Sequence, residues 1–166
     1  YAAAVLLDGQ RLLARPGLRA AEEALRRWLG AAALVRSGFT GGVVIVVADA
    51  GLPAVQALVR WDPAGSAARE LADRTALGFP PAVRAVEVSG HGTDVADLLR
   101  LVDLPAGSEV LGPVPTGEDG RERTLIRAPR RAASALSAAV KAAQAVRAAR
   151  RSGGAIRVRV DPADLD

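Results

Sequence analysis

Apolar residues recur along this chain with two different periods, and each change of period marks a predicted element. Near residues 16–36 they recur at steps of three and four, which predicts a helix with a proline in its first turn. The β-branched run Val43–Val47 predicts a strand buried on both faces. Residues 53–60 and 66–77 predict two short helices, and Gly78-Phe79-Pro80-Pro81 ends the second.

From residue 80 onward, runs typical of strands and helices alternate. The predicted elements are a strand over 83–89, a helix over 94–102, strands over 109–111 and 122–128, a helix over 130–151 and a strand over 156–160. This βαββαβ order predicts a ferredoxin-like arrangement in which two helices cover one face of an antiparallel sheet. The other face of that sheet is expected to be open.

The last helix and the last strand both separate apolar from polar positions. In the helix one stripe is apolar and is formed by Leu136, Val140, Ala143 and Val146. The opposite stripe is polar and contains Ser134, Ser137, Lys141, Gln144, Arg147 and Arg151. In the strand, Arg157 and Arg159 alternate with apolar residues, so both are expected to face water or a partner.

Charge is distributed very unevenly along the 166 residues. The net charge is +4 overall, but residues 121–159 hold eleven basic residues and one acidic residue. Such a segment favours a polyanionic partner. Two interpretations remain open: a solvated helix face in an arginine-rich protein of a GC-rich genome, or a nucleic-acid surface. The second interpretation assigns DNA-backbone contacts to Arg121, Arg123, Arg127, Arg130, Lys141, Arg147, Arg151, Arg157 and Arg159.

Composition argues against a catalytic centre within the chain. It contains no cysteine and a single histidine, His91, so a thiolate or multi-histidine metal site is excluded. His91 is expected to be a solvated loop residue, and the acidic groups of 94–103 are expected on a solvated helix face. No glycine-rich phosphate loop is present, and no apolar run is long enough to cross a bilayer. We therefore expect a cytoplasmic binding module without metal or cofactor, cut from a longer polypeptide.

Several short motifs, taken in order, resemble a known family. They are Arg15-Pro16-Gly17-Leu18-Arg19, Gly78-Phe79-Pro80-Pro81, Val110-Leu111-Gly112-Pro113-Val114-Pro115 and Val160-Asp161-Pro162. Together they span nearly the whole chain. They resemble the C-terminal region of the bacterial primosomal protein N′ (PriA) family of replication-restart helicases.

The resemblance implies an α+β chain in three parts. Residues 1–50 would be the end of the second RecA-like helicase lobe, 51–80 a helical linker, and 81–166 a ferredoxin-like, S10-like C-terminal domain. It also implies forked DNA, other primosome proteins and the acidic tail of single-strand-binding protein as partners, in a nucleoid-associated setting. Arg131 would contact that acidic tail. The alternative is an S10-like domain that binds RNA or protein without a replication role.

The chain departs from the family at its last helicase motif, Q-x-x-G-R-x-G-R, whose arginines stabilise charge on the transferred phosphate. The corresponding stretch is Leu29-Gly30-Ala31-Ala32-Ala33-Leu34-Val35-Arg36, in which Arg36 alone stands at an arginine position. We therefore expect the parent protein to be a degenerate helicase. The family's ATP, magnesium and zinc sites would lie upstream of this chain.

Overall fold

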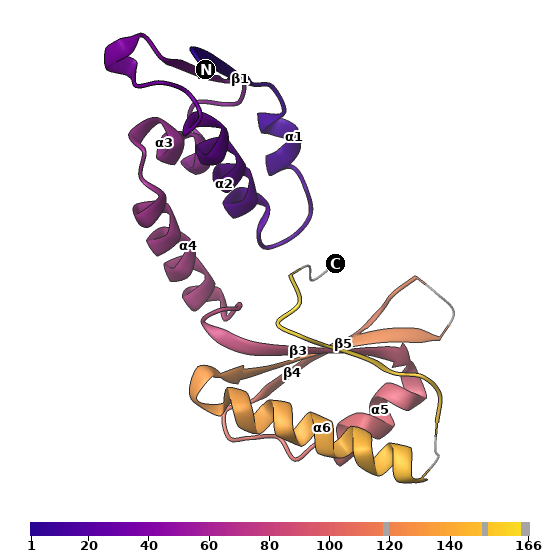
Figure 1. Cartoon of the computed structure of the whole chain (residues 1–166). Helices are drawn as coiled ribbons and strands as arrows, with labels where there is room; N and C mark the ends of the chain where they lie inside the picture. Colours follow the sequence, from indigo (N-terminus) through magenta and orange to yellow (C-terminus); the bar gives the residue numbers. More distant parts are fainter. Residues whose placement is uncertain (118–119, 151–152, 164–166) are drawn as a thin grey trace. The chain divides into compact units, whose positions relative to one another are not determined.

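The computed structural model describes residues 1–117, 120–150 and 153–163 of the chain (Figure 1). It has mixed α and β structure with two separate sheets. Tyr1–Glu70 makes up most of one compact unit, and Leu71–Pro162 forms the other. No helix in the described ranges is long and apolar enough to span a membrane.

The first unit is built on a two-stranded parallel sheet. Its elements are β1 (Ala3–Leu6), α1 (Gly9–Leu13), α2 (Ala20–Ala32), the 3₁₀ turn η1 (Gly38–Thr40), β2 (Val43–Val46) and α3 (Pro53–Arg60), followed by the start of α4 (Pro63–Leu77). Its core joins Trp28 and Leu25 of α2 to Val55 and Leu58 of α3. The helix predicted near 16–36 is therefore present but shorter.

Sequence patterns misjudged the strands of this unit. The pairing of β2 with β1 was missed, because Ala3–Leu6 is a short, alanine-rich segment with little β-branched character. Burial of the 43–47 run on both faces was also wrong. Val43 and Ile45 are each 50% exposed, and of the β2 residues it is Val46 that packs against the core of this unit.

The turn between α4 and the second sheet has a clear local cause. Gly78 adopts a left-handed conformation with φ of 66°, and the Phe79 N–H donates to the Arg74 carbonyl at 2.8 Å. This is the usual way for a helix to end at glycine, and the two prolines that follow cannot continue the helix. The predicted end of α4 is confirmed, although the helix begins at Pro63 rather than near residue 66.

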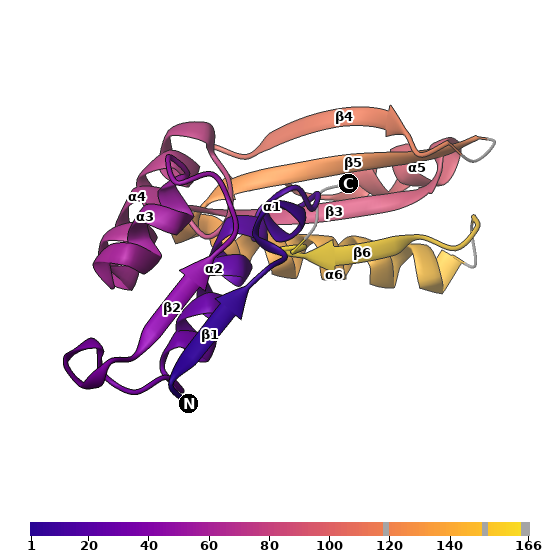
Figure 2. The same cartoon turned by 90° about the horizontal axis from the view of Figure 1, so that it is seen from above.

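The second unit is a four-stranded antiparallel sheet with two helices. Its elements are β3 (Val83–His91), α5 (Gly92–Leu101), β4 (Glu109–Pro115), β5 (Arg121–Pro129), the 3₁₀ turn η2 (Arg130–Ala132), α6 (Ala133–Arg150) and β6 (Arg157–Val160). The strands lie in the order β4-β5-β3-β6, which Figure 2 shows from above. The predicted succession of strands and helices is confirmed here, with β4 extending four residues further than expected.

The core of this unit lies between the sheet and both helices, which cover the same face (Figure 1). Val86 and Val88 of β3 and Ile126 of β5 are fully buried against Leu98 of α5 and Leu136 of α6. Successive strand residues point to opposite faces, so the residues between them lie on the face without helices. That second face therefore presents Glu87 and Ser89 of β3, Arg123 and Arg127 of β5, and the β6 arginines.

One turn of α6 differs from the predicted stripe. Leu136, Val140 and Ala143 are buried as expected, but the fourth buried member is Arg147 and not Val146. Val146 is 38% exposed. Arg147 follows Ala143 by four residues and reaches the carboxylate of Asp94, so pairing with a partner on α5 decides which residue turns inward.

Candidate nucleic-acid interface

The alternation Arg-Glu-Arg-Thr-Leu-Ile-Arg-Ala along β5 assigns its residues to the two faces of the sheet. Thr124, Ile126 and Ala128 are buried toward the helices. Arg123 and Arg127 lie between them on the open face and are half-buried. The ion pair of Arg127 with Glu109 of β4 agrees with this assignment, because the two residues are directly opposed in antiparallel strands and therefore share a face.

Toward one end of the open face, two arginines are neutralised within the protein. Arg159 holds Glu87 with three hydrogen bonds, from Nε to Oε1 at 3.0 Å and from Nη2 to Oε1 and Oε2 at 2.7 and 2.8 Å. Arg127 donates to a Glu109 carboxylate oxygen at 2.7 Å and to the Leu77 and Gly78 carbonyls. Both arginines are therefore paired within the protein. Arg159 lies on the open face as expected, with its side chain 35% exposed, but Glu87 compensates its charge.

Toward the other end of the same face, two arginines lack carboxylate partners in the described part of the chain. Arg123 of β5 and Arg157 of β6 both stand opposite Ser89 of β3 in the strand register. Neither arginine takes part in an ion pair or a side-chain hydrogen bond within the described residues, and Arg157 is exposed. Arg121 and His91 form the next opposed pair toward the strand ends, and both are exposed.

His91 ends β3 and caps the start of α5. Its Nδ1 lies 3.0 Å from the Thr93 hydroxyl. The side chain is exposed, as expected, although it belongs to a strand end rather than to a loop. It therefore adds a polar side chain at the same end of the open face as Arg123 and Arg157.

The basic residues around α6 fall into two groups. Arg131 and Lys141 are exposed, and no ion pair or hydrogen bond of their side chains occurs among the described residues. Arg130 donates to the Pro81 carbonyl at 2.8 Å and keeps its charge uncompensated by a carboxylate in the described ranges. Arg151 lies outside the described residues.

Arg147 is a correction to the predicted interface. Its side chain is 9% exposed and donates from Nη2 to Asp94 Oδ1 at 2.8 Å. The Asp94 side chain, expected on a solvated helix face, is 13% exposed and also accepts from the Gly154 N–H at 2.7 Å. A buried and neutralised arginine cannot contact a DNA backbone, so Arg147 belongs to the packing of this unit.

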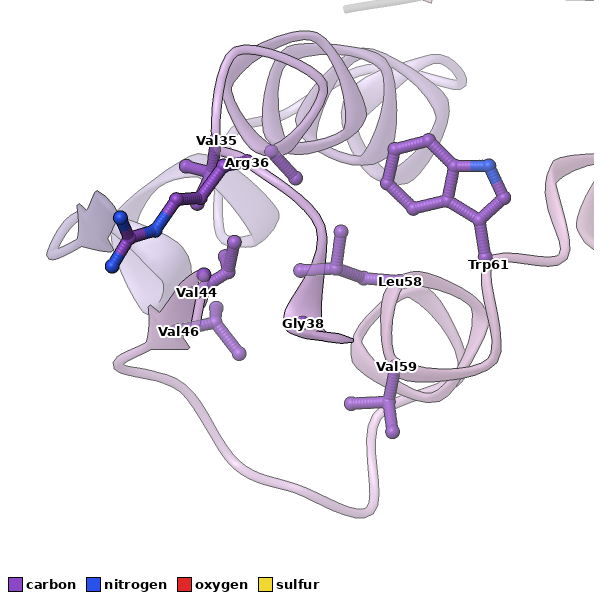
Figure 3. A pocket seen from close by; sticks show the side chains of 10 residues that line it. Val35, Arg36, Gly38, Val44, Val46, Leu58, Val59 and Trp61 are labelled. Carbon is purple, nitrogen blue, oxygen red and sulfur yellow. The ribbon is translucent and has the colours of Figure 1, made fainter. Parts of the chain in front are cut away.

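Arg36 lies in the first unit, in the connection that follows α2. It is exposed, and its backbone N–H donates to the Tyr1 carbonyl at 2.9 Å. It borders a hollow of about 320 Å³ whose other labelled side chains are mainly apolar, including Val46, Leu58 and Trp61 (Figure 3). Figure 3 shows the guanidinium directed away from Leu58 and Trp61. Among the described residues no second cation lines this hollow, so it lacks the paired arginines of a phosphate-transfer site.

Sequence patterns identified the arginines but missed the carboxylates that decide which of them are neutralised within the protein. Glu87, Glu109 and Asp94 neutralise three of the predicted DNA contacts, and Ser89 lies between two that stay unpaired. The partners lie 18 to 72 positions apart in the sequence. No local signal marks such pairs, because they depend on strand register and helix packing.

The part of the chain that matches a known protein family coincides closely with the second unit. Residues 75–163 match the family described as the primosomal protein N C-terminal domain. A probable replication restart protein PriA of Mycobacterium leprae (strain TN) is 44% identical over 173 residues, which cover 98% of this chain and 27% of that protein. Proteins of the same description from Mycobacterium tuberculosis (strain ATCC 25618 / H37Rv) and Mycobacterium bovis are 41% identical over 180 residues, covering 98% of this chain and 28% of each relative. The chain thus spans about a quarter of the length of these curated relatives.

Proposed function

Because this chain belongs to the family of the primosomal protein N C-terminal domain, with a general role in replication restart, we propose that it binds forked DNA through its second unit. The observation that carries the proposal is that some basic residues of this unit are paired with carboxylates and others are not. Arg123, Arg157, Arg131 and Lys141 have no carboxylate partner among the described residues, whereas neighbouring arginines do.

The chemistry of these residues favours the DNA backbone over the bases. Guanidinium groups bind phosphate oxygens through paired hydrogen bonds, and an unpaired guanidinium is available to do so. Residues 82–166 contain no Phe, Tyr or Trp, so stacking of bases on an aromatic platform has no residues to supply it. We therefore expect binding with little sequence preference and strong dependence on salt.

Fluorescence anisotropy of labelled forked DNA across a salt series tests the proposal. One variant replaces four unpaired cations of the second unit with glutamine, namely Arg123, Arg131, Lys141 and Arg157. A control variant removes four exposed arginines of the first unit, namely Arg11, Arg15, Arg19 and Arg60. Each DNA contact contributes about 0.9 to the slope of log K against log salt, so the first variant should lower the slope by up to about 3.6. Equal slopes for the two variants would reject the assignment.

Competition with duplex RNA addresses the alternative, an RNA- or protein-binding domain without a replication role. Forked DNA should displace labelled forked DNA at lower concentration than duplex RNA does. Stronger displacement by RNA would favour the alternative. If neither forked DNA nor duplex RNA binds, an acidic protein would remain as the partner of the basic residues.

A second proposal concerns the acidic tail of single-strand-binding protein. Arg131 supports it, because its side chain is exposed in η2, just before α6, and has no partner among the described residues. Titration with a peptide of that acidic C terminus should show weaker binding to Arg131→Ala. Arg150→Ala serves as the control, since Arg150 is an exposed arginine at the far end of α6. Equal affinities for the two variants would exclude Arg131 as the contact.

We further propose that the second unit is a ferredoxin-like, S10-like domain and that the first unit is the end of a helicase lobe. The division at residues 50 and 80 belongs to the same proposal, whereas the compact units divide between Glu70 and Leu71 and α3 packs in the core of the first unit. The parallel β1–β2 pair supports the second assignment, because parallel sheets are built from helix-connected strands. Arg36 as the one arginine left in the helicase motif supports a degenerate motor. DNA-stimulated ATP hydrolysis by a full-length protein carrying this segment would refute that last point.

A further inference from the structure

Three side chains from three strands form a row across the open face of the second sheet. Ser89 of β3 pairs in register with Arg123 of β5 on one side and with Arg157 of β6 on the other. Neighbouring strands lie about 4.8 Å apart, so the two arginine Cα atoms are roughly 10 Å apart with the serine between them. Two arginine side chains have the length to meet above such a central residue.

This row differs from the next rows along the same strands. One row further along β3, Glu87 faces Arg159 and neutralises it. Two rows along, Arg127 faces Glu109. In the Ser89 row no carboxylate of the described chain compensates either arginine, and the serine hydroxyl has no hydrogen-bond partner there. The row therefore concentrates two positive charges and one free hydroxyl in a small area.

We propose that Arg123, Ser89 and Arg157 together bind one phosphate group of a nucleic-acid backbone. Two guanidinium groups and a hydroxyl supply donors from three directions, which fits a tetrahedral phosphate better than a planar carboxylate. The inference rests on the proposed DNA-binding function and narrows it to one subsite. It also requires that the two arginines share a ligand instead of contacting separate phosphates.

Sharing a phosphate has a measurable signature. If both arginines hold one phosphate, Arg123→Gln and Arg157→Gln should each weaken binding of a labelled ten-nucleotide single strand about tenfold. The double variant should be little weaker than either single variant, because residues that share a ligand are not additive. For a single strand the salt slope should fall by about 0.7 in the single variants and by no more than about 0.7 in the double variant.

The matched control is Arg150→Gln. It removes the same charge from the last turn of α6, on the helix-covered side of the sheet, and Arg150 also lacks a side-chain partner within the described residues. Its affinity should stay within about twofold of wild type. Additive losses in the double variant with a slope change of about 1.4 would overturn the shared site in favour of two separate phosphate contacts. Losses equal to those of the control would overturn the subsite while leaving DNA binding in place.

A second measurement separates failure of the subsite from failure of the proposed function. Inorganic phosphate is titrated into the whole chain while the Nε–Hε resonances of the arginines are followed by NMR. The resonances of Arg123 and Arg157 should shift together with one dissociation constant, and Ser89→Ala should raise that constant. If DNA does not bind but these shifts occur, the function is wrong and the anion site stands. If other arginines shift and these two do not, the subsite is wrong.

Discussion

Breaking the buried ion pair between Asp94 and Arg147 should destabilise the second unit strongly. The two side chains are 13% and 9% exposed, and their charged atoms lie 2.8 Å apart. Removing one partner leaves the other charge buried, which costs about 3–5 kcal/mol. We therefore expect Arg147→Met to lower the free energy of unfolding by about that amount, although methionine fills much of the same space.

Two features of the surroundings reduce the expected loss of unfolding free energy. The Asp94 carboxylate keeps one hydrogen bond in the variant, from the Gly154 N–H at 2.7 Å. Arg147 Nε is buried with no hydrogen-bond partner in the described chain, so the arginine is not fully satisfied in the wild type. Both facts reduce the loss, which we place near the lower end, about 3 kcal/mol.

A double-mutant cycle isolates the pair. Asp94→Asn keeps an oxygen for the Gly154 N–H but leaves the Arg147 charge without its counter-ion. The double variant Asp94→Asn/Arg147→Met buries no unpaired charge. Its loss should therefore be smaller than the sum of the two single losses by about 1–3 kcal/mol.

The choice of assay follows from the positions of the tryptophans. Trp28 and Trp61 both belong to the first unit, so tryptophan fluorescence does not report on the second. Hydrogen exchange at the Val86 and Val88 amides of the central strand does, because these residues are fully buried in its core. A loss below about 1 kcal/mol in Arg147→Met, or additive losses in the cycle, would show that the buried pair contributes nothing specific.

Three further predictions concern single positions. Arg159→Leu should lower the free energy of unfolding by roughly 3 kcal/mol, because it leaves the carboxylate of Glu87, whose side chain is 3% exposed, without its counter-ion. Arg157→Leu on the same strand should change that free energy by less than about 0.5 kcal/mol. Hydrogen exchange of the sheet compares the two variants, and equal losses would contradict the pairing. Leu136→Ala should lower the free energy of unfolding by about 2–5 kcal/mol in the same measurement, since the side chain is fully buried. A loss under about 1 kcal/mol would mean that the surrounding side chains close in and leave no cavity. Hydrogen bonds from Arg26 and, to a smaller extent, from Arg27 lower the pKa of Glu23 from 4.5 to about 2. NMR titration should therefore show this carboxylate charged at about pH 3, and Arg26→Ala should return its pKa toward 4.5. Its small contribution to stability is complete above pH 4.5 and is lost as the pH falls through 2.

Much of the fold follows from short-range patterns. The alternation in β5 and β6 and the spacing of three and four in α6 predicted these elements within a few residues. The Gly78 stop signal likewise marked the end of α4. These features depend on neighbours within one or two turns or along one strand, and that information is contiguous in the sequence.

The proposed interface takes its charge from the sequence, whereas the tertiary structure decides which of its arginines are paired within the protein. The excess of arginine in residues 121–159 is enough to indicate a polyanionic partner. Which of these arginines remain available was decided by residues far away in the chain. Glu87 neutralises Arg159 across 72 positions, and Asp94 draws Arg147 inward across 53.

By itself, then, the amino-acid sequence determined the family, the order of strands and helices in the second unit, and the sign of its surface charge. Only the tertiary structure decided that Arg123 and Arg157 stay unpaired on either side of Ser89. The physical reason is that a charge acts on whatever the fold brings within a few ångströms. Strand register and helix packing set those neighbours, and neither is written in the local pattern of the chain.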